Sequence, residues 1–156
     1  MTGTALGALD ATGITYRIVR DEHVTSIAEA AEQAGVEIKD IIKTIVVRRA
    51  DDDYVFVLVP GDRSISWPKL RSILGVNRLS MPDAATAKDV TGYERGTITP
   101  FGSSTAWPVV ADERIVGRTI HIGAGERSTA VILDADEVVR VLDASTADVT
   151  ENPPTV

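Results

Sequence analysis

The sequence predicts a single α/β domain with a mixed, largely antiparallel sheet and helices packed on it. The chain has 156 residues, of which 44% are hydrophobic, and this suits one domain with a sizeable core. Short runs rich in β-branched residues alternate with segments of helical periodicity, which is typical of mixed α/β folds. Two of these runs, residues 41–47 and 54–59, flank a short acidic connection and therefore predict an antiparallel hairpin. Both runs are nearly all apolar, so we expect both faces of the hairpin to be covered.

The first segments of the chain alternate between helix and strand. Residues 4–12 predict a helix, and the apolar–polar alternation of residues 14–19 predicts a strand. Thr25 or Ser26 can cap the next helix, with Glu29 three residues after Ser26 as the partner of a capping box. Gly35 can end this helix, because glycine tolerates the left-handed backbone that follows many helices.

Two helices and a short strand are expected after the hairpin. Ser66 can cap a helix over residues 67–74. The expected apolar face of this helix consists of Leu70, Ile73 and Leu74. A short strand at residues 77–81 and a helix at residues 84–90, opened by Pro82-Asp83, should follow.

The last third of the chain completes the sheet. The expected strands are residues 109–110, 119–122 and 130–133. Asp134 can cap a final helix, which ends near Leu142. We therefore expect one domain at residues 1–150, followed by a flexible tail at residues 151–156 with little apolar surface to bury.

The composition excludes several classes of site. The absence of cysteine excludes disulfides, thiolate zinc sites and a cysteine nucleophile. The two histidines, His23 and His121, lie far apart and begin no metal-binding pattern, so we expect no metal centre and no cofactor. No apolar run is long enough to span a membrane, and the N-terminus lacks a signal-peptide pattern. We expect no membrane partner and a cytoplasmic location.

The distribution of charge leaves a nucleic-acid partner open. The net charge of −7 argues against indiscriminate binding to nucleic acid. Residues 39–95, however, carry 10 of the 16 Lys and Arg residues against 8 acidic residues. Either this middle segment forms a basic face that meets a phosphate backbone, or its charges are scattered and solvated.

A glycine-rich stretch at residues 91–102, the glycine loop, is one of two candidate functional motifs. It contains three glycines and one proline in twelve residues. Such a loop can direct bare backbone N–H groups at one point, as an anion or oxyanion site requires. The alternative is a plain turn between two elements.

The other candidate motif is the lysine near the start of the first hairpin strand. Lys43 is surrounded by isoleucine and valine, and burying an ammonium without a partner is costly. Either it serves a functional site, or it lies on the first exposed pleat and extends to water.

In order and spacing, three patches resemble the YbaK/prolyl-tRNA-synthetase-associated editing domain family. They are Ile42-Lys43-Thr44-Ile45-Val46-Val47, the glycine loop and Ile120-His121-Ile122-Gly123-Ala124-Gly125-Glu126-Arg127. The first is similar to the family's apolar–Lys–Thr strand, and the second to its TGY…GG-I-S/P-P-x-G loop. The third is similar to the strand and glycine turn that follow that loop in the family. The resemblance covers roughly residues 5–149.

The resemblance implies metal-independent hydrolysis of the aminoacyl ester at the 3′ end of a mischarged tRNA, with a positioned water and the substrate's own ribose hydroxyl. It implies Lys43 as the essential lysine and residues 96–102 as the loop that receives the ester. The residues expected to act in catalysis are Lys43, Gly96 and Gly102. The residues expected to bind substrate are Thr44, His23, Thr97, Ile98, Thr99, Pro100, Phe101 and Gly123. An aminoacyl-tRNA synthetase is a further expected partner.

The chain departs from the family pattern at three places. Gly96 is followed by Thr97, where the family often has a second glycine, and Thr97 would be strained if that site needs a positive φ. Asp21 stands where a tyrosine is common, and residues 129–131 lack an acidic residue found in the branch that acts on Cys-tRNA(Pro). These departures affect the amino-acid specificity more than the reaction.

Three hypotheses for the function follow. The first is a trans-editing aminoacyl-tRNA deacylase. The second is a non-catalytic module of the same fold that binds tRNA or a synthetase. The third is a hydrolase of another small acyl ester, which the acidic net charge favours because phosphate contacts dominate affinity for nucleic acid.

Overall fold

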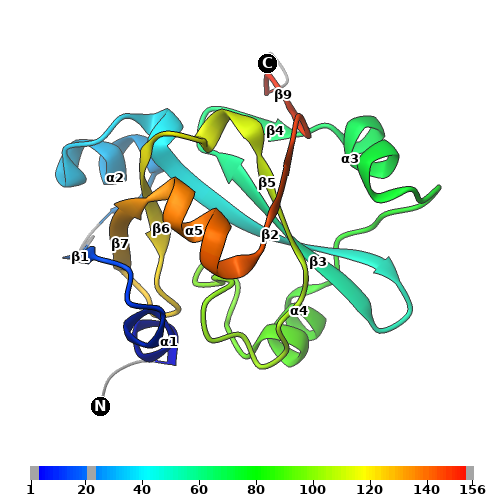
Figure 1. Ribbon diagram of the computed structural model, residues 1–156, viewed down its shortest axis with the longest axis horizontal. Coiled ribbons are helices and arrows are strands. Elements are labelled where there is room, and N and C mark those ends of the chain that lie inside the picture. The colour runs from blue at the N-terminus through cyan, green and yellow to red at the C-terminus, as the bar shows by residue number, and fades with distance from the viewer. Residues whose placement is uncertain (1–3, 21–23, 154–156) are drawn as a thin grey trace.

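The computed structural model describes residues 4–20 and 24–153. The strands of its main sheet are β1 (Tyr16–Arg20), β2 (Ile41–Ala50), β3 (Asp53–Pro60), β5 (Val109–Asp112), β6 (Thr119–Gly123), β7 (Thr129–Asp134) and β8 (Ser145–Ala147). They lie in the order β1-β7-β6-β2-β3-β5-β8 (Figure 1). Two short strands, β4 (Ser64–Ile65) and β9 (Thr150–Glu151), form a separate antiparallel pair.

The sheet is mixed, as the sequence predicts. The pairs β1–β7, β6–β7 and β2–β3 are antiparallel, whereas β2–β6, β3–β5 and β5–β8 are parallel. The antiparallel pairs contain most of the paired residues, and β2–β3 is the expected hairpin. The predicted fold class is therefore confirmed.

Helices surround this sheet and begin at the expected caps. They are α1 (Thr4–Thr12), α2 (Ile27–Ala34), α3 (Trp67–Leu74), α4 (Ala84–Thr91) and α5 (Ala135–Leu142), with short 3-10 turns η1 (Ile38–Asp40) and η2 (Glu113–Ile115). The hydroxyls of Ser26 and Ser66 accept hydrogen bonds from first-turn N–H groups of α2 and α3. The capping box of α2 is shifted by one residue, because the Glu29 carboxylate accepts from the N–H of Thr25.

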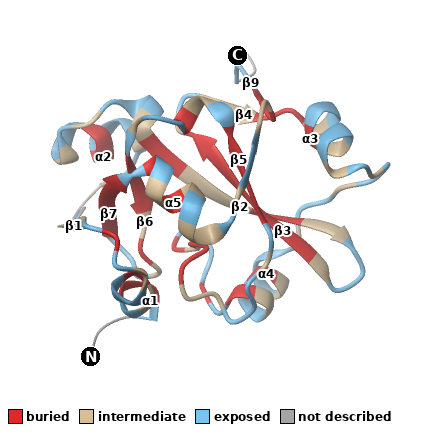
Figure 2. Cartoon of the chain, in the orientation of Figure 1, coloured by how far each residue is buried: buried red, intermediate tan, exposed pale blue. Residues whose placement is uncertain are grey.

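The two faces of the hairpin pack into different cores. Phe56 and Leu58 join one core with residues of α1 and α5, whereas Val57 and Val59 join another with Leu70 of α3. The side chains of these four residues of β3 are almost fully buried, and red covers most of β3 in Figure 2. The expectation that both faces are covered is confirmed.

The sheet divides between β2 and β6. These strands pair only at Ile41 with His121 and at Ile42 with Ile122, in the described part of the chain. Further along, β2 continues beside β3, while β6 ends at Gly123 and turns into β7. This divergence leaves one edge of β2 open, without a paired strand between Ile42 and the bridge from Arg48 to Ser80, among the described residues.

Several sequence expectations are wrong in detail. Residues 77–81 form no strand, because contact with β2 is limited to a bridge between Arg48 and Ser80. Ile73 is 50% exposed, because the buried stripe of α3 passes instead along the side of the helix that carries Leu70. The strands β8 and β9 were not predicted from the sequence. The segment expected as a loose tail begins inside β9, and residues 154–156 lie outside the described residues.

Candidate active site

A cavity of about 390 Å³ lies where β2 and β6 diverge. We call it the β2–β6 cavity. Its lining comes from β2, the start of α4, the glycine loop, the β6–β7 turn with its flanking strands, and α2. The lining residues are Ile41, Ile42, Lys43, Thr44, Ile45 and Val46, then Met81, Pro82, Ala84 and Ala87, then Arg95, Gly96 and Ile98, then His121, Gly123, Glu126, Ser128, Thr129 and Ala130, with Ile27. The volume falls within the range of about 300–1,000 Å³ typical of ligand pockets.

Lys43 is a half-buried cation among the residues that line this cavity. Its Nζ atom donates a hydrogen bond of 2.5 Å to the backbone carbonyl oxygen of Arg63. Burial lowers the pKa of Lys43 from its ordinary value, because the charged form loses hydration, while the Asp62 carboxylate opposes this shift. Lys43 is therefore neither on an exposed pleat nor without a partner. An ammonium has three donors, so two remain for other acceptors.

Thr44 presents polar groups to the same cavity from the opposite face of β2. Its Oγ1 atom is buried and has no hydrogen-bond partner among the described residues. The backbone contributes as well. The N–H of Arg48 donates to the carbonyl oxygen of Ser80, and the carbonyl oxygen of Arg48 accepts from the N–H of Ser80, on the side of β2 away from β3. Every second residue of a strand directs its N–H and C=O groups to the same side, so these groups of Thr44 and Val46 also point away from β3. The open edge of β2 thus borders the cavity with unused polar atoms.

The glycine loop is closed on itself by its own hydrogen bonds. The Tyr93 hydroxyl donates to the carbonyl oxygen of Phe101 at 2.5 Å, and burial raises the pKa of this hydroxyl. Thr97 donates through both its N–H and its hydroxyl to the carbonyl oxygen of Glu94. The backbone of Thr97 does not adopt a positive φ, so the strain considered for this position does not occur.

The expected site residues divide into two groups. Lys43, Thr44, Gly96, Ile98 and Gly123 line the β2–β6 cavity. Thr97, Thr99, Pro100, Phe101 and Gly102 belong to the glycine loop but not to the cavity lining. A Cβ atom on Gly102 would lie 2.7 Å from the carbonyl oxygen of Thr4, so this glycine serves close packing against α1. His23 lies outside the described residues. The catalytic and binding roles of all these residues stay predictions.

Part of the cavity wall was not predicted from the sequence. Met81, Pro82, Ala84 and Ala87 line it from the α4 side, and His121, which is 5% exposed, lines it from β6. Small apolar residues near a helix start give no chemical signal in a sequence. His121 stands in the third patch of the resemblance, and its position there was the available signal.

An arginine-lined hollow of about 460 Å³ was also missed as a site, although the excess of basic residues pointed to its segment. We define the arginine hollow by Arg48, Arg49, Arg71 and Arg78. Arg48 and Arg49 pair with Asp51 and Asp53. Arg71 and Arg78 form no ion pair with any described residue, so their guanidinium groups can bind an external anion. Ser80 joins this hollow to Met81 of the β2–β6 cavity.

The described ranges 4–20 and 24–153 contain no group of three or more His, Cys, Asp or Glu residues placed to hold a metal ion. None of the helices in these ranges has both the length and the apolar character needed to cross a membrane.

The sequence matches the model of the aminoacyl-tRNA editing domain family over residues 21–141. This chain belongs to that family. The matched residues of the editing domain include every wall of the β2–β6 cavity, from α2 to the β6–β7 turn. The resemblance inferred from the three sequence patches is thereby confirmed.

Relatives of the editing domain are both parts of larger proteins and proteins of similar length. A proline–tRNA ligase of Thermosipho melanesiensis is 36% identical over 98 residues, which are 63% of this chain but 17% of the ligase. A protein of Enterococcus faecalis named "Putative Cys-tRNA(Pro)/Cys-tRNA(Cys) deacylase EbsC" is 26% identical over 136 residues, 86% of this chain and 83% of that protein. A crystal structure described as "a putative trans-editing enzyme for prolyl tRNA synthetase" has a TM-score of 0.87 at 23% identity, covering 97% of this chain and 99% of that one, and shows the shared fold.

Proposed function

We propose that this editing domain is a trans-acting aminoacyl-tRNA deacylase, which hydrolyses the ester between an amino acid and the 3′ end of a mischarged tRNA. The observation that carries the proposal is that Lys43 and Gly96, from two motifs far apart in sequence, line one cavity. Family membership and the name of the Enterococcus faecalis relative support the same reaction. A cytoplasmic location, where tRNAs are charged, belongs to this proposal.

The reaction needs donors for a developing negative charge. Water adds its hydroxyl to the ester carbonyl carbon, the bond from this carbon to the ribose oxygen breaks, and the ribose oxygen takes up the proton. The carbonyl oxygen becomes negative on the way, and fixed N–H donors or a cation stabilise it. The backbone N–H groups of Gly96 and Ile98 and the ammonium of Lys43 are the candidate donors.

Lys43 has two possible tasks in this scheme. One of its N–H donors is held by Arg63, and the others can reach the ester carbonyl or a phosphate of the terminal adenosine. In either task it acts as a compact point charge in a desolvated place, where electrostatic interactions are stronger than in water.

The cavity lining suits the recognition of an amino-acid side chain. Ala84, Ala87 and Ala130 form apolar walls together with Ile41 and Ile45. Apolar walls discriminate by size, because an amino acid that is too large cannot enter. The unpartnered Thr44 hydroxyl gains an acceptor or donor when the polar part of the aminoacyl group binds.

The arginine hollow favours a tRNA substrate over a small free ester. Arg48 follows Val46 of the cavity by two residues, which is roughly 7 Å along a strand. A tRNA whose terminal ester enters the cavity can therefore place backbone phosphates near the guanidinium groups of Arg71 and Arg78. A prolyl-tRNA synthetase is the proposed protein partner, because the editing segment of the Thermosipho melanesiensis relative lies within a proline–tRNA ligase.

A deacylation screen tests the proposal. The protein is incubated with a panel of mischarged tRNAs and, in parallel, with the corresponding free aminoacyl esters. We expect turnover of one or a few mischarged tRNAs and little turnover of free esters. Equal turnover of both would instead indicate a general ester hydrolase, and tRNA binding without turnover would indicate a non-catalytic module.

A further inference from the structure

Arg63 connects the candidate catalytic lysine to the C-terminal strand. Its backbone carbonyl oxygen accepts the hydrogen bond from Lys43 Nζ, while its side chain points to β9. The turn that precedes it is closed by a bond of 3.0 Å from the N–H of Arg63 to the carbonyl oxygen of Pro60. The same residue thus holds Lys43 with its main chain and β9 with its guanidinium group.

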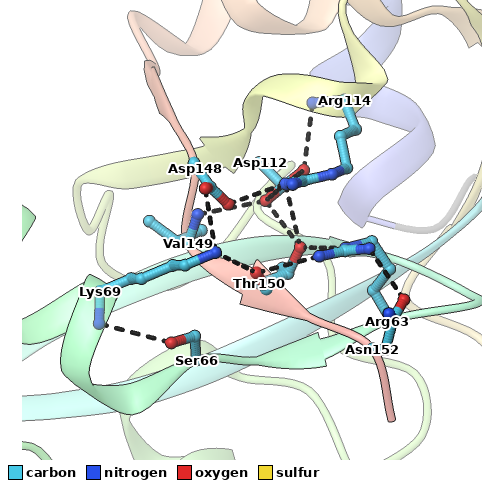
Figure 3. Close-up of polar contacts among 9 residues, drawn as sticks. All are labelled: Arg63, Ser66, Lys69, Asp112, Arg114, Asp148, Val149, Thr150 and Asn152. Atoms are coloured by element: carbon cyan, nitrogen blue, oxygen red, sulfur yellow. Dashed lines mark hydrogen bonds and ion pairs between the residues drawn. The ribbon is translucent and has the colours of Figure 1, made fainter.

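The guanidinium group of Arg63 is held by three acceptors from β9 and the residue after it. Nε donates to Thr150 Oγ1 at 2.6 Å, and Nη2 donates to the Thr150 carbonyl oxygen at 3.1 Å. Nη1 donates to Asn152 Oδ1 at 3.2 Å (Figure 3). A planar guanidinium with several bonds to one segment has little freedom to turn, so these contacts fix the position of Arg63.

Thr150, which accepts two of these three bonds, is itself held by a buried carboxylate at the end of β5. Thr150 donates through its hydroxyl to Asp112 at 2.8 Å, and the N–H of Val149 donates to the same carboxylate at 3.2 Å (Figure 3). Asp112 is fully buried at the end of β5. Val149 is also fully buried, and its carbonyl oxygen accepts from the N–H of Ser66. Thr150, which anchors Arg63, is therefore held in place by buried residues of the core.

We propose that Arg63 is a positioning residue for Lys43, through which β9 holds the lysine ammonium at the β2–β6 cavity. The inference rests on the proposed role of Lys43 in deacylation. Residues 145–152, which supply the anchor, lie beyond the family match that ends at residue 141. Loss of the anchor frees the turn at Arg63, so its carbonyl oxygen no longer fixes the direction of the ammonium. Misplacement by about 1 Å can cost about 10²-fold in rate.

Two variants and one control test this link. Arg63→Ala removes all three contacts with the C-terminal segment and keeps the carbonyl group. Asn152→Ala removes one exposed acceptor and leaves Thr150 in place. The control is Lys69→Ala, because Lys69 also binds this segment, at Asp148 and the Thr150 carbonyl oxygen, but does not contact the turn before β4. For each variant, kcat and KM are measured on the best mischarged tRNA, with thermal unfolding as the test of the fold.

The second readout is the ammonium group itself. In protein labelled with ¹⁵N-lysine, the Lys43 ammonium signal is assigned by its loss in Lys43→Ala. We expect Arg63→Ala to lower kcat by about 10–10²-fold with little change in KM, and to broaden or shift this signal. Asn152→Ala should change both in the same direction and to a smaller extent, whereas Lys69→Ala should change neither.

The outcomes separate this inference from the proposed function. A folded Arg63→Ala protein with parental kcat and an unchanged Lys43 signal would overturn the inference and leave the deacylase proposal intact. If Arg63→Ala does not fold, Asn152→Ala decides, and an unchanged signal there overturns the link. If the parent deacylates no tRNA, the proposed function fails, and the ammonium signal still decides whether Arg63 positions Lys43.

Discussion

Gly96 and Gly102 both have left-handed backbones, yet they face different parts of the molecule. Gly96, with φ of +89°, lines the β2–β6 cavity, and a Cβ atom there would meet nothing within 4 Å. Gly102, with φ of +71°, packs so closely on α1 that a Cβ atom would lie 2.7 Å from the Thr4 carbonyl oxygen. One glycine of the loop therefore faces the candidate site, and the other faces the core.

This difference predicts different consequences for the two glycines. Gly96→Val should lower deacylation by about 10²–10³-fold, the typical effect of losing one oxyanion donor, and reduce stability modestly through its positive φ. Gly102→Val should lower the thermal midpoint strongly, because the backbone of Thr4 cannot yield. Thr99→Ala should be mild, since its hydroxyl accepts only a 3.5 Å bond from Phe101 within the loop. Kinetics and thermal unfolding of the three variants check this order. Gly96→Val with parental turnover would remove the loop from the site.

Lys43→Ala should remove most deacylation while the fold remains. The hydrogen bond to Arg63 is lost, but no buried charge is left unpaired, so the cost to stability is small. We expect kcat to fall by about 10²-fold or more. Lys39→Ala is the control, because Lys39 is an exposed lysine paired with Glu37 in the preceding turn. Equal turnover of the two variants would contradict the role of Lys43.

The arginine hollow predicts a salt-dependent contribution to tRNA binding. Arg78→Ala should weaken binding of every tRNA to a similar degree and reduce the slope of log K against log salt by about 1. Arg140→Ala is the control, because Arg140 lies on α5 and pairs with Glu137. Binding is measured at several salt concentrations. An unchanged slope for Arg78→Ala would show that tRNA phosphates bind elsewhere.

Chelation should leave deacylation unchanged. The chain has no cysteine, and its two histidines have no ligand spacing, so we expect a reaction that relies on Lys43 and backbone donors. The measurement compares turnover before and after exhaustive treatment with EDTA. Activity that is lost and then restored by zinc would refute metal independence.

The ion pairs of Asp148 predict a loss of stability in acid. The Arg114 guanidinium, and after it the Lys69 ammonium, lower the pKa of Asp148 from 3.8 to about 2. A carboxylate with a lowered pKa in the folded state stabilises the fold above about pH 4, and this contribution disappears as the pH falls through about 2. The difference in free energy of unfolding between the parent and Asp148→Asn should therefore shrink between these pH values. A difference that stays constant would contradict the assignment.

Local signals in the sequence predicted most of the fold. Ser26, Ser66 and Asp134 begin helices as expected, because N-cap chemistry depends on a few neighbouring residues. The strands β8 and β9 escaped prediction because they are short and polar, and partners far away in sequence stabilise them. Propensity carries little information on such pairings.

The candidate site was predictable where chemistry marks it. Lys43 is conspicuous because a cation interrupts an apolar strand, and Gly96 because it stands in a glycine-rich loop. The residues that position them were not predictable. Arg63 acts through its carbonyl group, which every amino acid possesses, so no residue type reveals this contact.

The divergence of β2 from β6 also has a consequence for how the cavity comes into existence during folding. Its walls extend from Ile27 to Ala130 along the chain, so no short fragment contains all of them. The β2–β3 hairpin needs only a short connection, whereas the pairing of Ile41 with His121 must close a long loop, and such contacts form slowly. A partly folded chain with the hairpin alone thus presents Lys43 on an ordered strand but offers no enclosed space for an ester.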